Sequence, residues 1–392
     1  MRRTDLEVLR IALCAAVILA HALIIFSADP NYHIKSAEAS QFATLATEFI
    51  RISAMATFFT IAGYTAVASL RARGPLEFAR TRVVRLFVPL LFGVVTSGTI
   101  IKYIEMMQGR DFGFHGLRKA RTLQQMLDVD PSVPLGFFDF FPRNLGILNL
   151  LTWSHLWFLG YLLIISLMLL PLLVLLARRA PDPSKLNAAV LFLPALPLGL
   201  YLAAFDGYWP FLPNLIGDWT NFFYFAMYMT FGAMIAAWPG IDVQLRAQAP
   251  RFAVLMALAF AGVAYFGVST PGRVFVGLTA WFCVCAALGF AIRFKPAVAT
   301  PALTYLAAAT LPVYIIHHAV LLLIGVEVMN LPLPVWSKVT VILLATVAVS
   351  LAIYHWLIRP WRPMRWLLGM STAPAAASRA PDSAAAKPAL SQ

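Results

Sequence analysis

Arg10 and His21 are the ionisable side chains that flank and interrupt an otherwise apolar run over residues 11–26. They are eleven residues apart, which on a helix is three turns plus about 20°, so both lie on one face. At 1.5 Å per residue they are separated by about 16 Å along the axis. An ionisable residue inside a membrane helix favours a functional role. Burial disfavours the imidazolium form, so His21 is expected to be neutral and able to act as a general base. A histidine hydrogen-bonded to a neighbouring helix for packing is an equally good interpretation.

A second group of charges precedes the third apolar segment. Arg82 and Arg85 are three residues apart, with Arg80 close by, and can present their side chains on one helical face. Guanidinium groups bind phosphate oxygens in pairs, so this cluster suits a phosphate-rich ligand. The alternative is that the cluster anchors the helix at the cytoplasmic surface or contacts anionic lipid.

Further histidines are expected at a similar depth to His21. His155 opens the fourth apolar segment, and the adjacent pair His317 and His318 lies in the outer half of the ninth. Because neighbouring residues on a helix point 100° apart, we expect at most one of that pair to face the shared centre. Three histidines could hold a metal in principle, but no carboxylate or thiolate accompanies them at ligand spacing, so no metal is predicted. The aromatic residues around His155 are also typical of an interfacial belt.

Glu48 is the carboxylate that could orient a catalytic imidazole. It lies three residues before Arg51, however, and an i,i+3 ion pair between the two is the simpler expectation.

The composition defines the protein class. Hydrophobic residues make up 61% of the chain and charged residues 12%, which is typical of an integral membrane protein. The net charge of +13 is then explained by Lys and Arg in cytoplasmic loops, so no nucleic-acid partner is predicted. Since open sheets cannot exist in lipid and barrel-type alternation is absent, we expect an all-α polytopic fold. About ten transmembrane helices are predicted, over residues 6–26, 45–69, 84–105, 152–176, 187–204, 219–238, 252–268, 273–292, 303–325 and 336–358.

The loops predict the orientation. If the N-terminus is cytoplasmic, the loops on that side hold most of the Lys and Arg, whereas the short outer loops hold only Lys35, Arg273 and Lys338. Both termini are therefore expected in the cytoplasm. Residues 1–370 form the predicted membrane domain, which includes a long periplasmic loop over about 106–151. Residues 371–392 are rich in Ala, Pro and Ser and are expected to form a disordered cytoplasmic tail.

Five motifs in order give a resemblance that covers residues 4 to 370. Two departures occur within them, since Glu7 stands where an Asp is usual and Ala62 where a Ser is usual. The chain resembles the membrane-bound acyltransferases of family 3, which O-acylate sugars and other envelope components, and within them it is similar to the branch that succinylates periplasmic glucans. The motifs are the Arg10-to-His21 spacing, Phe58–Tyr64, Arg82-x-x-Arg85, His155–Leu159 and Tyr314–His318.

The resemblance implies a bacterial inner-membrane enzyme that works from both sides. Acyl-CoA, as acetyl-CoA or succinyl-CoA, would approach from the cytoplasm with its phosphates held by Arg82, Arg85 and Arg10. A glycan hydroxyl would enter from the periplasm, and His21 would take its proton or relay the acyl group, with Glu48, His155 and His317 as further candidate catalytic residues. The sequence contains no GxSxG elbow, so it gives no support to a serine-hydrolase route.

Two other functions fit the same features. A proton-coupled exporter of a glycan or small solute would need a buried histidine but no phosphate-binding arginine pair. A structural member of an envelope-assembly complex, held to partner proteins and membrane lipids, would tolerate loss of both sites.

Overall fold

The computed structural model describes residues 3–113, 116–119, 125–128, 135–179, 188–209, 213–296 and 298–370. The predicted disordered tail, 371–392, lies outside these residues. The first half of the described chain contains α1 (Thr4–Ile24), α2 (Gln41–Arg82), the π-helix η1 (Val83–Phe87), α3 (Val88–Gly93), the π-helix η2 (Val94–Gly98), α4 (Thr99–Met107), the antiparallel strands β1 (Arg110–Gly113) and β2 (Gly116–Lys119), α6 (Phe137–Gly146) and the 3-10 helix η3 (Leu148–Leu150).

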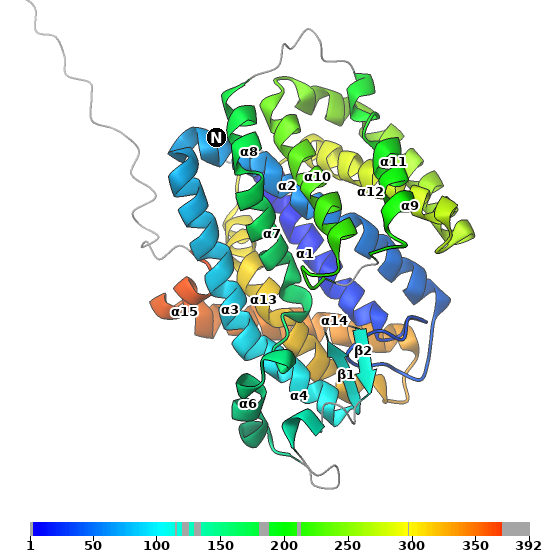
Figure 1. Cartoon of the computed structure of the whole chain (residues 1–392), viewed down its shortest axis with the longest axis vertical. Helices are drawn as coiled ribbons and strands as arrows, with labels where there is room; N and C mark the ends of the chain where they lie inside the picture. Colours follow the sequence, from blue (N-terminus) through cyan, green and yellow to red (C-terminus); the bar gives the residue numbers. More distant parts are fainter. Residues whose placement is uncertain are drawn as a thin grey trace, which may run out of the picture.

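In the described part of the second half, all regular secondary structure is helical. It contains η4 (Ser154–Leu156), α7 (Trp157–Met168), α8 (Leu170–Arg178), η6 (Ala188–Leu191), α9 (Ala195–Phe205), α10 (Trp219–Ala237), α11 (Ile241–Phe266), α12 (Thr270–Arg293), α13 (Pro301–Met329), α14 (Val335–Ala352), η7 (Ile353–Ile358) and α15 (Arg362–Leu367). Figure 1 shows these helices gathered around α1 and α13.

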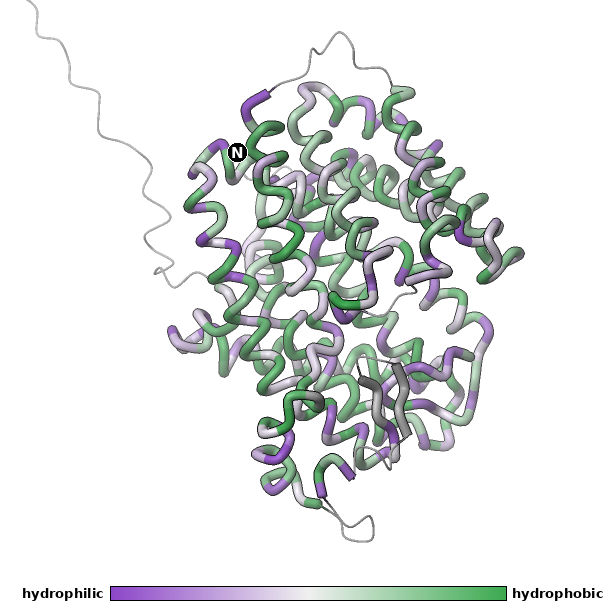
Figure 2. The backbone as a smooth tube through the Cα atoms, in the orientation of Figure 1, coloured by the Kyte–Doolittle hydropathy of each residue, from purple (hydrophilic) through white to green (hydrophobic). Residues whose placement is uncertain are grey.

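The expected all-α polytopic membrane fold is confirmed. Seven helices among the described residues are long and apolar enough to cross a membrane, or eight if the bent pair Ser154–Met168 and Leu170–Arg178 counts as one span. Figure 2 shows hydrophobic residues along most of the helices, and many large apolar side chains are exposed, as expected where lipid is the solvent. Helices coincide with all ten predicted segments, but the number that span the bilayer stays a prediction.

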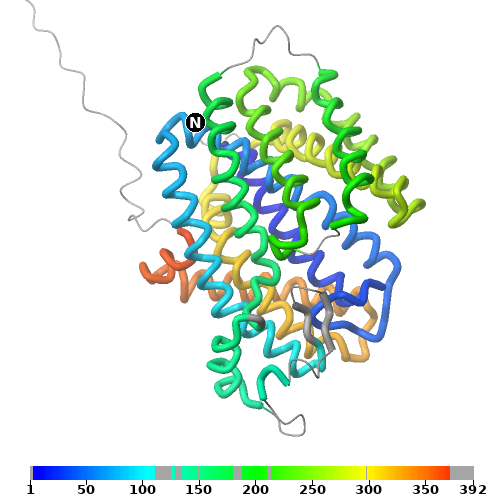
Figure 3. Tube along the Cα trace, in the orientation of Figure 1, coloured from blue at the N-terminus to red at the C-terminus, as the bar shows by residue number. Residues whose placement is uncertain are grey.

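The long helical stretch from Gln41 to Met107 reverses direction once. Gly74 has φ 77° and ψ 174°, a conformation that only glycine adopts without strain, and Pro75 follows it. Figure 3 shows the chain turning back there, so that α2 and the segment from α3 to α4 run as separate rods. This turn explains why one continuous stretch accounts for two predicted spans.

Glycine allows α2 and α10 to pack backbone against backbone. A Cβ on Gly63 would lie 1.8 Å from the Met229 carbonyl oxygen, and one on Gly232 would lie 2.0 Å from that of Thr60. Small residues at such crossings are the usual means of helix association in membranes. The motif at 58–64 therefore has a structural function, because it fixes α2 against α10.

The predicted outer loop, 106–151, contains secondary structure in its described parts. The strands β1 and β2 form a hairpin, and the phenylalanine-rich segment forms α6. Phe140 is fully buried against Tyr103, whereas Phe138 is 89% exposed. α6 therefore presents one apolar face to the protein and another to its surroundings.

Candidate functional site

Five histidines from four segments meet at one end of α1. His21 lies in the last turn of α1, His33 follows in the connection to α2, His155 lies in η4, and His317 and His318 lie in α13. The ring centroid of His21 is 4.2 Å from that of His318 and 5.6 Å from that of His317. We call these five residues the histidine cluster; His155 and His33 join it through His318, at 4.7 and 5.0 Å.

Of the adjacent pair, His318 lines the same cavity as His21 and His317 does not. His317 is fully buried behind it, with its ring centroid 5.0 Å from that of His155. The rings of the pair stack at 6.1 Å, so both reach His21 from adjacent positions of α13.

A hydrogen-bonded chain runs through the cluster from a buried ion pair. Lys102 Nζ donates to Glu105 Oε2 at 2.5 Å, and His33 Nδ1 contacts Glu105 Oε1. His33 Nε2 lies 3.0 Å from Ser154 Oγ, which lies 3.4 Å from His318 Nδ1. His318 Nε2 lies 2.9 Å from the Tyr32 hydroxyl, which lies 3.4 Å from His21 Nδ1.

With Glu105 as acceptor and every imidazole neutral, one set of directions runs through the chain; in it the single hydroxyl proton of Tyr32 goes to His318 Nε2 and not to the His21 carbonyl oxygen, which lies 3.2 Å away. Because an ionised carboxylate only accepts, His33 Nδ1 carries the proton and its Nε2 accepts from the Ser154 hydroxyl. Ser154 then accepts from His318 Nδ1–H, whose Nε2 accepts from Tyr32. His21 Nδ1–H donates to Tyr32, which leaves the Nε2 lone pair of His21 free to accept a proton.

Backbone carbonyls fix the other two imidazoles. His155 Nε2 donates to Tyr314 O at 2.9 Å, and His317 Nδ1 donates to the same oxygen at 2.8 Å. The second nitrogen of each ring, Nδ1 of His155 and Nε2 of His317, is buried without a hydrogen-bond partner among the described residues. Two neutral imidazoles thus offer lone pairs beside His21, which suits a ligand that donates protons.

The cavity in front of the cluster has a volume of about 1000 Å³. Its walls combine aromatic rings with two ion pairs, Glu48 with Arg51 at 2.7 Å and Asp206 with Arg273 at 2.9 Å. The lining includes His21, Tyr32, His33, Ser154, His155 and His318 together with Trp153, Trp157 and Tyr224. Aromatic faces beside charged groups are well matched to a polyhydroxylated ligand, which has apolar faces and hydroxyl edges.

Glu48 accepts hydrogen bonds from Arg51 at the cavity wall, and among the described residues it accepts none from a histidine. The orientation of an imidazole that we considered for Glu48 is instead provided by Glu105, through His33. Tyr32, which joins His318 to His21, lies in the connection between α1 and α2. Burial raises the pKa of its phenol well above the ordinary value, so Tyr32 stays protonated over the physiological range.

Lys35 holds the end of α1 that carries His21. Its ammonium group donates to the carbonyl oxygens of Ile24 and Ser27, each at 2.6 Å, so it caps the last turn of the helix. Burial lowers the pKa of this side chain to about 8. The connection between α1 and α2 therefore both caps α1 and places Tyr32 and His33 in the cluster.

The three arginines predicted to bind phosphate meet toward the other end of α1. Arg10 Nη2 donates to Thr65 Oγ1 at 3.3 Å, and Arg82 Nη2 donates to Ala62 O at 3.4 Å, so both side chains reach the same turn of α2. Arg85, on η1, is exposed and close enough to repel Arg82 electrostatically, as Arg10 does. We call Arg10, Arg82 and Arg85 the basic cluster.

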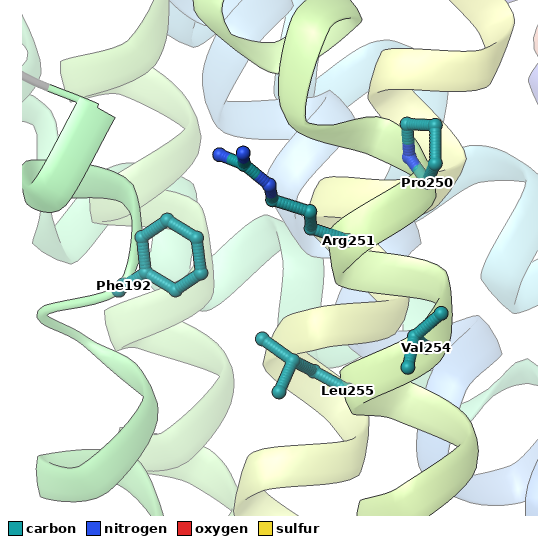
Figure 4. A pocket seen from close by; sticks show the side chains of 5 residues that line it. All are labelled: Phe192, Pro250, Arg251, Val254 and Leu255. Atoms are coloured by element: carbon teal, nitrogen blue, oxygen red, sulfur yellow. The ribbon is translucent and has the colours of Figure 1, made fainter.

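A second hollow, of about 420 Å³, is lined by Phe192 and by residues 250–255 of α11, and contains no residue of either cluster. Figure 4 shows Arg251 extending from α11 toward the side of Phe192, with Val254 and Leu255 on the next turn of the helix. Its guanidinium donates to Gln248 at 2.8 Å. This hollow contains no second group able to do acid–base or nucleophilic chemistry, so it is not the candidate site.

Sequence reasoning missed Tyr32, His33, Lys102, Glu105 and Ser154 as members of the site. Lys102 and Glu105 could have been found, because two ionisable residues inside the apolar segment 84–105 call for a partner in the membrane. Tyr32 and His33 lie in an irregular connection, and Ser154 is one hydroxyl among many. Among the described residues, no group of three His, Cys, Asp or Glu side chains is arranged to hold a metal ion.

The family comparison agrees with this geometry. A model of the family 3 acyltransferase domain matches residues 3–355, which include both clusters and nearly the whole chain. Neither the curated proteins nor the solved structures give a match. This all-α membrane protein, matched over nearly its whole length, belongs to the family 3 membrane acyltransferases.

Proposed function

We propose that this acyltransferase moves an acetyl or succinyl group from cytoplasmic acyl-CoA to a hydroxyl of an envelope or periplasmic glycan. The observation that supports this most directly is that α1 contributes one residue to each of the two polar clusters. α1 runs unbroken from Thr4 to Ile24 and carries Arg10 near one end and His21 near the other. Donor phosphates and reacting carbonyl can then occupy opposite ends of the same element.

The basic cluster supports acyl-CoA as the donor. The guanidinium of Arg82 is repelled by those of Arg10 and Arg85, and a nucleotide with several phosphates would supply the negative charge that offsets this repulsion. A proton-coupled exporter would use the histidines but has no role for this cluster. The family match supports acyl transfer. It gives no support to an exporter or to a structural member of an envelope-assembly complex.

The large cavity supports a glycan acceptor. Its ion pairs and aromatic rings suit a sugar, and it opens at the histidine end of α1. The Nε2 lone pair of His21 would take the proton of the attacking hydroxyl, and the buried lone pairs of His155 and His317 would hold neighbouring donors. With the basic loops inside, the enzyme would lie in a bacterial inner membrane with this cavity toward the periplasm.

The first test measures binding and turnover separately, with purified protein in nanodiscs and acetyl-CoA or succinyl-CoA as the probe. Wild type is expected to bind acyl-CoA and to release CoA. Arg82→Ala/Arg85→Ala is expected to bind about 10- to 100-fold more weakly, because charge-assisted phosphate contacts are lost. His21→Ala is expected to bind normally and to transfer roughly 10²–10⁴-fold more slowly, because it lacks the base.

The matched control is Arg71→Ala/Arg73→Ala, which removes two positive charges from exposed positions of the same helix, α2. It should bind acyl-CoA as wild type does. Equal binding by all variants would show that the basic cluster only orients the protein in the membrane. Unchanged acyl transfer by His21→Ala would remove His21 from the mechanism.

A further inference from the structure

Ser154, His33 and Glu105 have the connectivity of a nucleophilic triad. Ser154 Oγ lies 3.0 Å from His33 Nε2, and His33 Nδ1 bonds Glu105 Oε1. Serine on Nε2 and carboxylate on Nδ1 is the arrangement in which an imidazole removes the serine proton, and such triads are recognised by geometry and not by sequence order. Ser154 and His33 both line the cavity, while Glu105 is fully buried behind them.

The backbone at Ser154 is held in a conformation that serine rarely adopts. Its φ is +40°, in the left-handed region, at the first residue of η4 just before α7. The Ser154 amide donates to Thr152 Oγ1 at 3.1 Å, and Gly98 leaves room for the Thr152 carbonyl next to η2. Strain of this kind persists where the surroundings impose it and marks functional positions. A serine on a sharp turn that leads into a helix is also how hydrolases expose a nucleophile.

The ion pair behind the triad keeps its acid in the required form. Lys102 and Glu105 are both almost completely buried, and their side chains are 2.5 Å apart. The Glu105 carboxylate accepts hydrogen bonds from both Lys102 and His33 Nδ1–H, and the neutral tautomer with its proton on Nδ1 leaves Nε2 bare for Ser154. Replacing either member of a buried pair leaves the other charge without compensation, so the pair also holds His33 in place.

We propose that Ser154 is the acyl-accepting nucleophile and that the enzyme works through an acyl-serine intermediate. This rests on the acyl-transferase function proposed above. Ser154 Oγ attacks the thioester carbonyl, and its proton passes to His33 Nε2. The carbon–sulfur bond breaks, and the CoA thiolate leaves with that proton, so an oxygen ester remains on Ser154 and His33 is neutral again.

The second half-reaction uses the rest of the hydrogen-bonded chain. The glycan hydroxyl attacks the ester carbonyl and gives its proton to His21 Nε2. His21 Nδ1–H passes a proton to Tyr32, Tyr32 passes one to His318 Nε2, and His318 Nδ1–H reprotonates the departing Ser154 oxygen. One proton moves from the acceptor hydroxyl to Ser154, and the acyl group moves the other way.

The test uses the full chain in nanodiscs with acetyl-CoA and no acceptor, quenched in acid and measured by intact-protein mass spectrometry. Wild type is expected to gain one acetyl group and to release one CoA per protein, with the ester located on Ser154 by peptide fragmentation. His21→Ala is expected to form the same adduct, because the first half-reaction does not need it. Glu105→Gln, in a positioning residue, should slow adduct formation roughly 10²–10⁴-fold and alter its pH profile, since the wrong tautomer of His33 is favoured.

Two variants remove the hydroxyl and differ in their effect on the backbone. Ser154→Ala keeps the strained φ, whereas Ser154→Gly relaxes it, so folding failure cannot explain a loss in both. Both should bind acetyl-CoA and form no adduct. Ser154→Cys should form a thioester that neutral hydroxylamine cleaves faster than the serine ester. The matched control is Ser166→Ala, a buried serine on α7 that contacts Met229, and it should form the adduct as wild type does.

The outcomes separate this proposal from the one on which it rests. Full transfer by Ser154→Ala, or an adduct on a histidine, would overturn the serine nucleophile and leave acyl transfer intact. Wild type that neither binds acetyl-CoA or succinyl-CoA nor releases CoA would overturn the proposed function, and the acyl-serine with it.

Discussion

Tyr32 is the only side chain that connects His318 to His21 in the described hydrogen-bonded chain. Its phenol is buried and stays protonated, so it can pass a proton between two imidazoles without holding charge. Removal of its hydroxyl breaks the chain between His21 and Ser154 and leaves the triad of Ser154, His33 and Glu105 intact. This separation allows the two half-reactions to be tested at the scale of one atom.

Tyr32→Phe is expected to form the acetyl adduct at the wild-type rate and to discharge it at least about tenfold more slowly, because Ser154 must then be reprotonated from solvent. The measurement is the decay of the isolated acetyl-enzyme on addition of a glucan acceptor. Tyr103→Phe, which removes a hydroxyl that bonds Leu135 O and no other described residue, is the control. Equal decay in both variants would exclude Tyr32 from proton transfer.

The residues that the sequence identified are those embedded in long apolar runs. His21, His155 and His317 stand out there because a polar side chain in a membrane helix requires an explanation. The structure brings all three together. Ser154 and His33 could not be identified in the same way, since their function depends on a contact across 121 positions of the chain. No periodicity records that contact.

At the scale of elements, the π-helix η2 sets the position of the segment that carries Ser154. A Cβ on Gly98 would lie 2.4 Å from the Thr152 carbonyl oxygen, two residues before Ser154. Ser97 on the same π-helix donates to Ile315 O at 3.1 Å, so η2 also contacts α13 beside the histidines. Irregular helical turns of this type are frequent at functional sites.

Gly98→Ala is expected to displace Thr152 and, with it, Ser154 from His33. Alanine favours a helix by about 1 kcal/mol over glycine, but insertion of a methyl group into a packed contact costs about 1–3 kcal/mol, so the clash decides the sign. The rate of adduct formation should fall clearly, whereas the melting temperature should fall only slightly. Gly146→Ala, at the exposed end of α6 with no atom within 4 Å of the new Cβ, should change neither the adduct rate nor the unfolding temperature substantially.

The sequence predicted the limits of a helix correctly where the helix coincides with an apolar run. The fifth and seventh segments, predicted over 187–204 and 252–268, correspond to η6 with α9 and to α11. α11 begins eleven residues earlier than predicted, at Ile241, because its first turns are polar and extend beyond the apolar run. The turn at Gly74 was not predicted, since a single positive φ has no signature in hydropathy.

At the scale of the whole molecule, the proposed mechanism requires the two ends of α1 to face different compartments. Ala39 is exposed near the histidine cluster, and Arg73 is exposed at the far end of α2. In a background without the native cysteines Cys14, Cys283 and Cys285, a membrane-impermeant maleimide should label Ala39→Cys in intact spheroplasts. It should label Arg73→Cys only after lysis. The opposite pattern would place the basic cluster outside the cell and contradict cytoplasmic acyl-CoA as donor.

The unbroken course of α1 has a consequence for which donors the enzyme accepts. Because a continuous helix cannot shorten, Arg10 and His21 stay about 16 Å apart along its axis, and the helix acts as a ruler. A donor must bring its carbonyl to Ser154 while its phosphates remain at the arginines, so the length of its flexible arm becomes a selected property. An acetyl donor whose arm is much shorter than that span could bind the arginines but could not bring its carbonyl to Ser154, so it would not react.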